Sequence, residues 1–302
     1  MPDLSEPPDP VSGSDWVSLA EVSRILHVPM ATVRSWELRY AIPQTLRPSG
    51  KHRRYTPPDL YALTLLRDAI AGGARAGVAA QAVRSRLGLS GPPATFIGQF
   101  LSASAHLDAD AMRYQLDRAA HTLALGNCLD DVLFPAMRQV GLRWAGGDCD
   151  IDHERLTTET VRSWLHTRTV LAPAPVHLTP VVLACGPVDQ HTLGLEALGV
   201  LLRHRGRTCR QLGARTPIKT LTTAVHASDA SAVVVVSQLS EGRSRAIESL
   251  HAAHELGASV FYAGAAFGSA RHRRDLCGTY LGTRLQPACA LIDAALTPIN
   301  AP

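Results

Sequence analysis

The stretch VDQHTLGLEALG carries side chains with the types and spacing of a metal or cofactor site. Asp189, His191 and Gly194 stand at positions i, i+2 and i+5. On its own this pattern has two interpretations: a loop that ligates a metal through one imidazole, or a polar turn between a strand and a helix that happens to hold a histidine. The sequence on either side has to decide between them.

Two further polar signals follow at defined distances. Ser237-Gln238-Leu239 begins after another 42 residues beyond Gly194, and Ala263-Gly264 follows Leu239 after another 23. Each of the three stretches comes where an apolar run ends. The carboxyl ends of parallel strands share one edge of a sheet, and ligands bind at that edge. We therefore expect the three stretches to lie together.

The elements that would position them form an α/β pattern. Residues 181–297 alternate short β-branched runs with helical patterns, which predicts a doubly wound, Rossmann-like parallel sheet covered by helices on both faces. Residues 94–170 read as three or four amphipathic helices, with Met112, Leu116, Ala119 and Ala120 on one face of one of them. A proline-rich connector, residues 171–180, joins the two blocks.

Composition bounds the kind of protein. The chain has 302 residues, 46% hydrophobic and 19% charged, which indicates a soluble globular protein of two or three domains. We find neither an apolar run of 18 residues nor a signal peptide, so we expect a cytoplasmic protein with no membrane partner. The six cysteines form no CxxC pair, which favours reduced thiols over a zinc site. No Ser/His/Asp arrangement or phosphate loop supports independent catalysis.

The N-terminal block is basic. Residues 15–88 carry eleven Lys and Arg against five Asp and Glu, an excess of positive charge that is typical of nucleic-acid-binding domains. Ser18 and Glu21 form a capping box, which predicts a helix to about Leu26, and a second helix from Met30 to Tyr40 completes a helix-turn-helix. The DNA-contacting side chains would be Arg34, Ser35 and Arg39 on the second helix and Lys51, His52, Arg53 and Arg54 on a wing around Gly50. The alternative is a solvated basic face.

A family resemblance sharpens this interpretation. The segment TVRSWELRY, followed by GKHRRYTPPDL, resembles the winged helix-turn-helix of the MerR family, in the branch that carries W-E-x-R-Y. The resemblance implies binding as a dimer to a palindrome-like site in double-stranded DNA, with Tyr55 also on the wing. The chain breaks at GLSGPP, where metal-sensing MerR proteins have a long coiled coil, so we expect dimerisation from elsewhere.

The three polar signals resemble the cobalamin-binding domain, whose pattern is D-x-H-x-x-G, about 42 residues, S-x-L and then GG. The resemblance implies that His191 ligates cobalt from below and that Asp189 holds the other ring nitrogen. The cofactor would also contact Thr192, Gly194, Ser237, Leu239, Ala263 and Gly264. Small residues at several of these positions would let the nucleotide tail pass the backbone. Ala263 replaces the first glycine of the pattern.

The middle block, VGLRWAGGDCDIDHERLTTE, resembles the helical cap of the light-responsive MerR regulators of the CarH/LitR type. The resemblance implies adenosylcobalamin, with Trp144 and Glu154 shielding its upper face. Ala145 and Arg155 stand where that family has histidines, so the bis-histidine state that follows cleavage of the cobalt–carbon bond by light is not expected. A shift of one or two residues would bring His153 into that place.

These inferences give four segments: a disordered tail (1–14), a winged helix-turn-helix domain (15–88), a four-helix cap (94–172) and a cobalamin-binding Rossmann-like domain (180–298). We expect a homo-oligomeric transcriptional regulator, a repressor, that senses cobalamin and is not an enzyme, with light or the state of the cofactor controlling its oligomerisation. Two alternatives remain: a regulator that senses another ligand or a protein partner, and a corrinoid carrier or mutase subunit. The DNA domain and the lack of room for a substrate-binding barrel disfavour the carrier.

Overall fold

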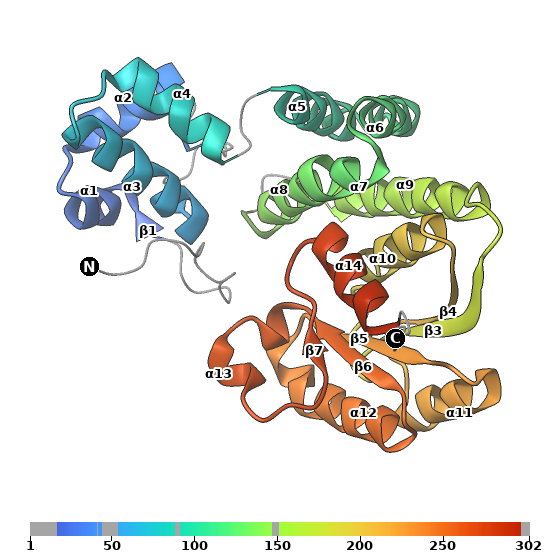
Figure 1. The fold of residues 1–302 in the computed structure, drawn as a ribbon. Helices are drawn as coiled ribbons and strands as arrows, with labels where there is room; N and C mark the ends of the chain where they lie inside the picture. The colour runs from blue at the N-terminus through green and yellow to red at the C-terminus, as the bar shows by residue number, and fades with distance from the viewer. Residues whose placement is uncertain (1–16, 41, 44–53, 88–90, 147–150, 297–302) are drawn as a thin grey trace, which may run out of the picture. The chain divides into compact units, whose positions relative to one another are not determined.

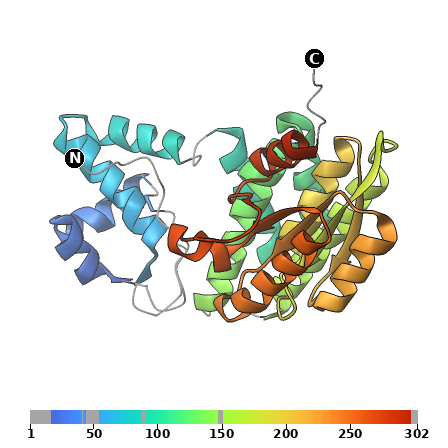
Figure 2. The same ribbon diagram turned by 60° about the horizontal axis from the view of Figure 1, so that its bottom comes forward.

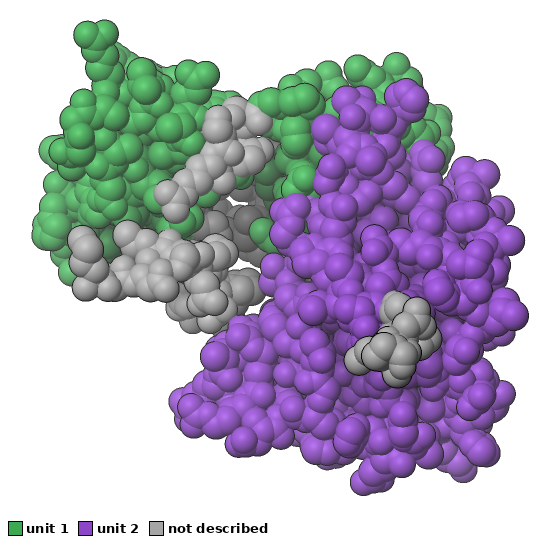
Figure 3. Space-filling model, viewed as in Figure 1, with its two compact units in different colours: residues 1–119, 131–157 green, residues 120–130, 158–302 purple. Residues whose placement is uncertain are grey.

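The computed structural model describes residues 17–40, 42–43, 54–87, 91–146 and 151–296. The disordered tail predicted for residues 1–14 lies outside this part of the chain. The chain divides into two compact units, residues 1–119 with 131–157 and residues 120–130 with 158–302 (Figure 3). Each unit is described by itself.

The chain begins with the predicted helix-turn-helix. The side chain of Ser18 accepts from the Glu21 amide at 3.3 Å, and Glu21 accepts in return from the Ser18 amide at 2.7 Å. This reciprocal capping box starts α1 (Leu19–Leu26), and α2 (Met30–Tyr40) follows after a short turn, both with the expected bounds.

Two short strands and two helices complete this region. β1 (Val17–Ser18) pairs antiparallel with β2 (Arg54–Tyr55), and α3 (Pro57–Ala71) and α4 (Ala76–Arg86) follow. Their apolar side chains form one core; its fully buried members are Val22, Leu26, Val33, Ile42, Tyr55, Leu63, Leu66 and Ala79. The predicted wing around Gly50 lies outside the described residues, apart from β2.

Four long helices account for most of the described residues between 92 and 170. They are α5 (Pro92–Ala105), α6 (Ala109–Leu123), α8 (Phe134–Gly146) and α9 (Ile151–Val170). Between α6 and α8 stand α7 (Leu125–Cys128) and a π-helical turn, Leu129–Leu133. Met112, Leu116 and Ala119 are fully buried on one face of α6, as their spacing predicts, whereas Ala120 is half-buried.

A five-stranded parallel sheet follows, in the order β4-β3-β5-β6-β7. Its strands are β3 (His177–Cys185), β4 (Arg207–Gly213), β5 (Ala232–Val236), β6 (Ser259–Ala263) and β7 (Thr279–Tyr280). β5, with the sequence AVVVV, is buried along its whole length, because helices cover both of its faces.

The covering helices fall into two layers. α10 (Leu193–His204) and α14 (Leu285–Leu296) pack together on one face of the sheet, and α11 (Ile218–Ser228) and α12 (Arg243–Glu255) pack on the other (Figures 1 and 2). A four-residue helix, α13 (Ala270–Arg273), comes between β6 and β7 in the order of the chain. The doubly wound fold is therefore confirmed.

The described cysteines Cys128, Cys185, Cys209, Cys277 and Cys289 are free thiols, and all but Cys277 are buried. Within the described ranges, no helix is both long and apolar enough to span a membrane.

Candidate functional site: the carboxyl edge of the sheet

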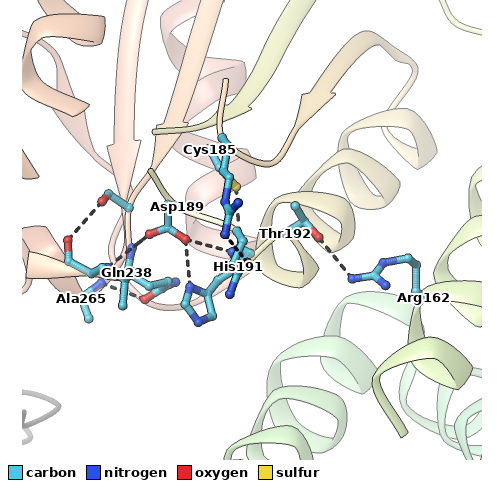
Figure 4. Close-up of polar contacts among 11 residues, drawn as sticks. Arg162, Cys185, Asp189, His191, Thr192, Gln238 and Ala265 are labelled. Atoms are coloured by element: carbon cyan, nitrogen blue, oxygen red, sulfur yellow. Dashed lines mark hydrogen bonds and ion pairs between the residues drawn. The ribbon is translucent and has the colours of Figure 1, made fainter. Parts of the chain in front are cut away.

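The loop after β3 holds a buried carboxylate under a half-exposed imidazole. Asp189 is fully buried, whereas the side chain of His191 is 51% exposed. The Asp189 Oδ1 atom accepts from the His191 amide and lies 2.9 Å from ring atom Nδ1 (Figure 4). The carboxylate thus engages Nδ1, so Nε2 is the ring nitrogen through which His191 would ligate a metal.

The same carboxylate joins two strand ends. Asp189 Oδ2 accepts from the backbone amides of Gln238 and Leu239, the latter at 3.2 Å, so the loop after β5 is tied to the loop after β3. Two of the three sequence signals are therefore brought together by one side chain.

This environment keeps Asp189 ionised. Burial acts to raise the pKa of Asp189, but the hydrogen bonds from His191 and from the two amides outweigh it and lower that pKa to about 2. Nearby, burial raises the pKa of the Cys185 thiol to about 12, and the charges of Asp189 and Glu196 act in the same direction. Cys185 is therefore not a thiolate that competes with His191 for a metal.

The third signal, Ala263-Gly264, packs directly against the second. The Ser237 amide donates to the Ala263 carbonyl at 3.0 Å, and the Ala266 amide donates to the Ser237 carbonyl at 3.1 Å. Gly264 has φ +107°, and a Cβ there would lie 2.1 Å from the Ser237 carbonyl oxygen. Glycine is thus required at 264 by the neighbouring backbone of the chain itself, which differs from the expected reason, passage of a cofactor tail.

The other predicted contacts lie around this edge. Ser237 is fully buried, and its hydroxyl faces the Leu239 carbonyl at 3.5 Å. Thr192 begins α10 without a side-chain cap hydrogen bond. A Cβ on Gly194 would meet no atom within 4 Å, so the chain leaves open space beside this residue.

Two residues at or beside this edge were not predicted. The Gln238 side chain accepts from the Ala265 amide at 2.9 Å and so links the loops after β5 and β6. Arg162, on α9, reaches Thr192 (Figure 4). Gln238 stands at the variable position of S-x-L and Arg162 outside every motif, so the pattern gave no signal for either.

The residues expected over the upper face of a cofactor lie on two helices. Trp144 belongs to α8 and Glu154 to α9. The Arg155 side chain is exposed, and the buried Nδ1 atom of His153 has no hydrogen-bond partner. These contacts remain predictions.

The predicted DNA-contacting residues divide into three groups. Arg34 and Arg39 are exposed on α2, with Ser35 half-buried between them. Lys51, His52 and Arg53 lie outside the described residues, and Arg54 belongs to β2.

Tyr55 requires a correction. Its side chain is fully buried and its hydroxyl donates to Glu37 Oε1 at 2.5 Å, so Tyr55 braces β2 against α2 and leaves no side-chain surface exposed for a contact with DNA. The resemblance to the MerR family had implied a position on the DNA-contacting wing.

The described residues contain no group of three or more His, Cys, Asp or Glu side chains able to hold a metal ion. A corrinoid needs one axial ligand from a protein, because its macrocycle supplies the equatorial nitrogens of the cobalt. The single imidazole over a buried carboxylate fits that requirement.

Comparison with known proteins supports the same interpretation. Residues 17–85 match the MerR HTH family regulatory protein model, and residues 97–168 match the B12 binding domain model. The solved monomethylamine corrinoid protein of Methanosarcina barkeri aligns over 68% of this chain and 100% of its own, with a TM-score of 0.56 and 10% identity, which shows a shared fold.

Fold and matched domains together define a MerR-type DNA-binding regulator that carries a B12 binding domain. Two transcriptional repressors of Myxococcus xanthus are similar over most of their lengths. CarA is 30% identical over 204 residues, 66% of this chain and 69% of CarA. CarH is 29% identical over 267 residues, 83% of this chain and 88% of CarH. The chain belongs to this family of HTH-type transcriptional repressors. As expected from the sequence, it is a regulator and not an enzyme.

Proposed function

We propose that the chain represses transcription by binding DNA through its N-terminal domain and senses cobalamin at the carboxyl edge of the sheet. The observation that carries the proposal is the Asp189–His191 pair. A buried, ionised carboxylate holds Nδ1 of a half-exposed imidazole where the ends of three parallel strands meet.

His191 would be the lower ligand of cobalt, through Nε2. Asp189 would fix the tautomer by accepting a hydrogen bond from the protonated Nδ1, and its charge would make the imidazole a stronger donor to the metal. When bound, an alkylcobalamin supplies a cobalt–carbon bond whose cleavage changes what occupies its upper face. The contacts proposed for its nucleotide tail are Thr192, Gly194, Ser237, Leu239, Ala263 and Gly264.

The upper face would be covered by Trp144 and Glu154, and adenosylcobalamin is the form that we propose. Ala145 and the exposed Arg155 stand where the light-responsive regulators have histidines. We therefore propose that any light response of this chain does not depend on a histidine at either position. Oligomerisation as a dimer or tetramer, controlled by the state of the cofactor, would set the affinity for the operator.

The DNA interface would consist of Arg34, Ser35 and Arg39 with the wing residues Lys51, His52, Arg53 and Arg54. Arginine suits both phosphates and guanine edges, because its guanidinium presents several donors in one plane.

The test is a dark and an illuminated absorbance spectrum of the full chain reconstituted with adenosylcobalamin, followed by size-exclusion chromatography. His191→Ala is the site variant and His226→Ala, an exposed histidine on α11, is the matched control. We expect retained cobalamin in the wild type and the control and loss of histidine ligation in His191→Ala. A chain that retains no corrinoid would refute the proposal, and bound corrinoid without an effect of light would indicate a sensor of the cofactor itself.

A regulator with the same fold that senses another ligand or a protein partner is the second candidate. Ala263 at the first glycine position favours it, because its methyl group narrows the space for a nucleotide tail. Ala263→Gly separates the two: tighter cobalamin binding by this variant supports the cofactor, whereas binding by neither form supports the alternative.

A further inference from the structure

Arg162 joins α9 to the first turn of α10, immediately after His191 (Figure 4). Its Nε donates to Glu196 Oε1 at 3.3 Å, and its Nη2 reaches Thr192 Oγ1 at 3.5 Å. Nη1 pairs with Glu159, one turn earlier on α9. Glu196 is mostly buried, with 18% of its side chain exposed. One guanidinium therefore spans α9 and the helix that follows the predicted metal ligand.

Thr192 connects this contact with His191, because it follows His191 directly in the chain. A threonine at a helix N-cap ordinarily accepts from an amide of the first turn, but Thr192 has φ −85° and ψ −20° and makes no such bond. Its hydroxyl faces Arg162 instead. His191 is thus held from one side by Asp189 and, through the next residue in the chain, from the other side by Arg162.

The charges around Arg162 favour a lasting contact. Burial acts to lower the pKa of Arg162, but its hydrogen bonds and ion pairs with Glu159 and Glu196 outweigh this effect and raise that pKa. The guanidinium is therefore always charged, and Arg can donate to two or three acceptors at once, which Lys cannot do with the same geometry.

We propose that Arg162 is a positioning residue for His191. Arg162 holds the loop between Asp189 and α10 against α9, so that a displacement of His191 on metal ligation is passed on to α9. This inference rests on the proposed function. α9 also carries Glu154, predicted for the upper face, about two turns before Arg162. α9 would therefore carry Glu154 at the upper face of the cofactor and Arg162, which positions the ligand of the lower face.

The experiment uses the full chain and cob(II)alamin. Electron paramagnetic resonance reports the axial nitrogen directly: a histidine nitrogen splits the cobalt signal into a triplet, and labelling the protein with nitrogen-15 histidine converts it to a doublet. Affinity is measured by titration of absorbance. The variants are Arg162→Gln and Arg162→Lys, with Glu196→Gln removing the same ion pair from the partner side.

Arg113→Gln is the matched control. Arg113 forms a comparable pair with Asp110 on α6, and its side chain is 42% exposed against 38% for Arg162. We expect Arg162→Gln and Glu196→Gln to weaken cobalamin binding about two- to fivefold, because the lost pairs are partly exposed. We also expect a smaller share of signal with histidine splitting, partly restored in Arg162→Lys and unchanged in Arg113→Gln.

The outcomes distinguish a failure of cobalt ligation by His191 from a failure of the role of Arg162. A wild-type chain whose cobalt signal carries no histidine nitrogen overturns the proposed function and this inference with it. A wild-type chain with histidine splitting, together with unchanged splitting and affinity in folded Arg162→Gln and Glu196→Gln, overturns the role of Arg162 alone.

Discussion

Replacement of Asp189 by Asn tests the buried carboxylate at the centre of the carboxyl edge. The substitution keeps the shape of the side chain but removes its charge. Asp189 accepts four hydrogen bonds, two from His191 and one each from the amides of Gln238 and Leu239. An Asn amide can accept at one atom only, so its NH₂ group would face donors.

The magnitude follows from the pKa. The side chain is fully buried, and its pKa falls from 3.8 to about 2, which corresponds to about 2 kcal/mol of stabilisation of the folded state. Loss of acceptors for buried donors adds about 1–3 kcal/mol per unsatisfied group. We therefore expect Asp189→Asn to lower the free energy of unfolding by about 2–4 kcal/mol at neutral pH.

The stabilisation by Asp189 depends on pH in the direction that its lowered pKa dictates. Because the folded-state pKa is depressed, this stabilisation is fully present above the unfolded-state pKa of about 4 and is lost as the pH falls through about 2. The difference between wild type and Asp189→Asn should therefore be constant above about pH 5 and shrink between about pH 4 and pH 2.

Hydrogen exchange in peptides that cover β3 and β5, followed at increasing urea, measures this effect in the unit that contains Asp189. Asp130→Asn is a matched control, because Asp130 is also buried and caps the Leu285 and Gln286 amides at 2.7 and 3.1 Å. The Asp130→Asn variant should raise hydrogen exchange in α14 first. Equal stability of wild type and Asp189→Asn at pH 7, or a difference that persists undiminished at pH 2, would refute the reasoning.

Three further outcomes follow. Gly264→Ala should lower the free energy of unfolding by more than about 3 kcal/mol, because its Cβ would lie 2.1 Å from the Ser237 oxygen. Gly194→Ala, where a Cβ meets open space, should leave the free energy of unfolding almost unchanged. Similar urea midpoints for the two variants would contradict this expectation. Tyr55→Phe should cost about 1–2 kcal/mol through loss of its hydrogen bond to Glu37, with DNA affinity at low temperature retained, and a specific loss of DNA binding by the folded variant would show that Tyr55 contacts DNA after all. Arg34→Ala should weaken DNA binding measured by fluorescence anisotropy and, where Arg34 meets a phosphate, reduce the salt slope by about one, and an unchanged affinity would remove Arg34 from the interface.

Local signals in the sequence predicted most of the fold. The capping box of Ser18 and Glu21 marks the start of α1 because both partners lie within one turn. The run AVVVV predicts a strand buried on both faces for the same reason: the information is contiguous. The meeting of Asp189 with the loop after β5 could be predicted because the carboxyl ends of parallel strands share an edge.

Contacts between distant segments could not be predicted. Arg162 stands 30 residues before Thr192, and no spacing rule relates a helix side chain to a loop after a strand. Gln238 occupies a position that the pattern leaves open. Tyr55 follows a basic run, but its ring belongs to the buried core of its region, and only the packed structure brings Glu37 of α2 to its hydroxyl. Gly264 was recognised, but the reason for it, the approach of the Ser237 backbone, is a property of packing.

The most direct test of the central claim is the affinity of the full chain for DNA with and without adenosylcobalamin, using a duplex selected by the chain from a random pool. Coupling between a ligand site and DNA binding of ordinary strength changes affinity by about 5- to 150-fold. If the site senses cobalamin, the wild type shows such a change and His191→Ala loses it. An affinity that does not respond to cobalamin, or that responds equally in His191→Ala, would contradict the claim.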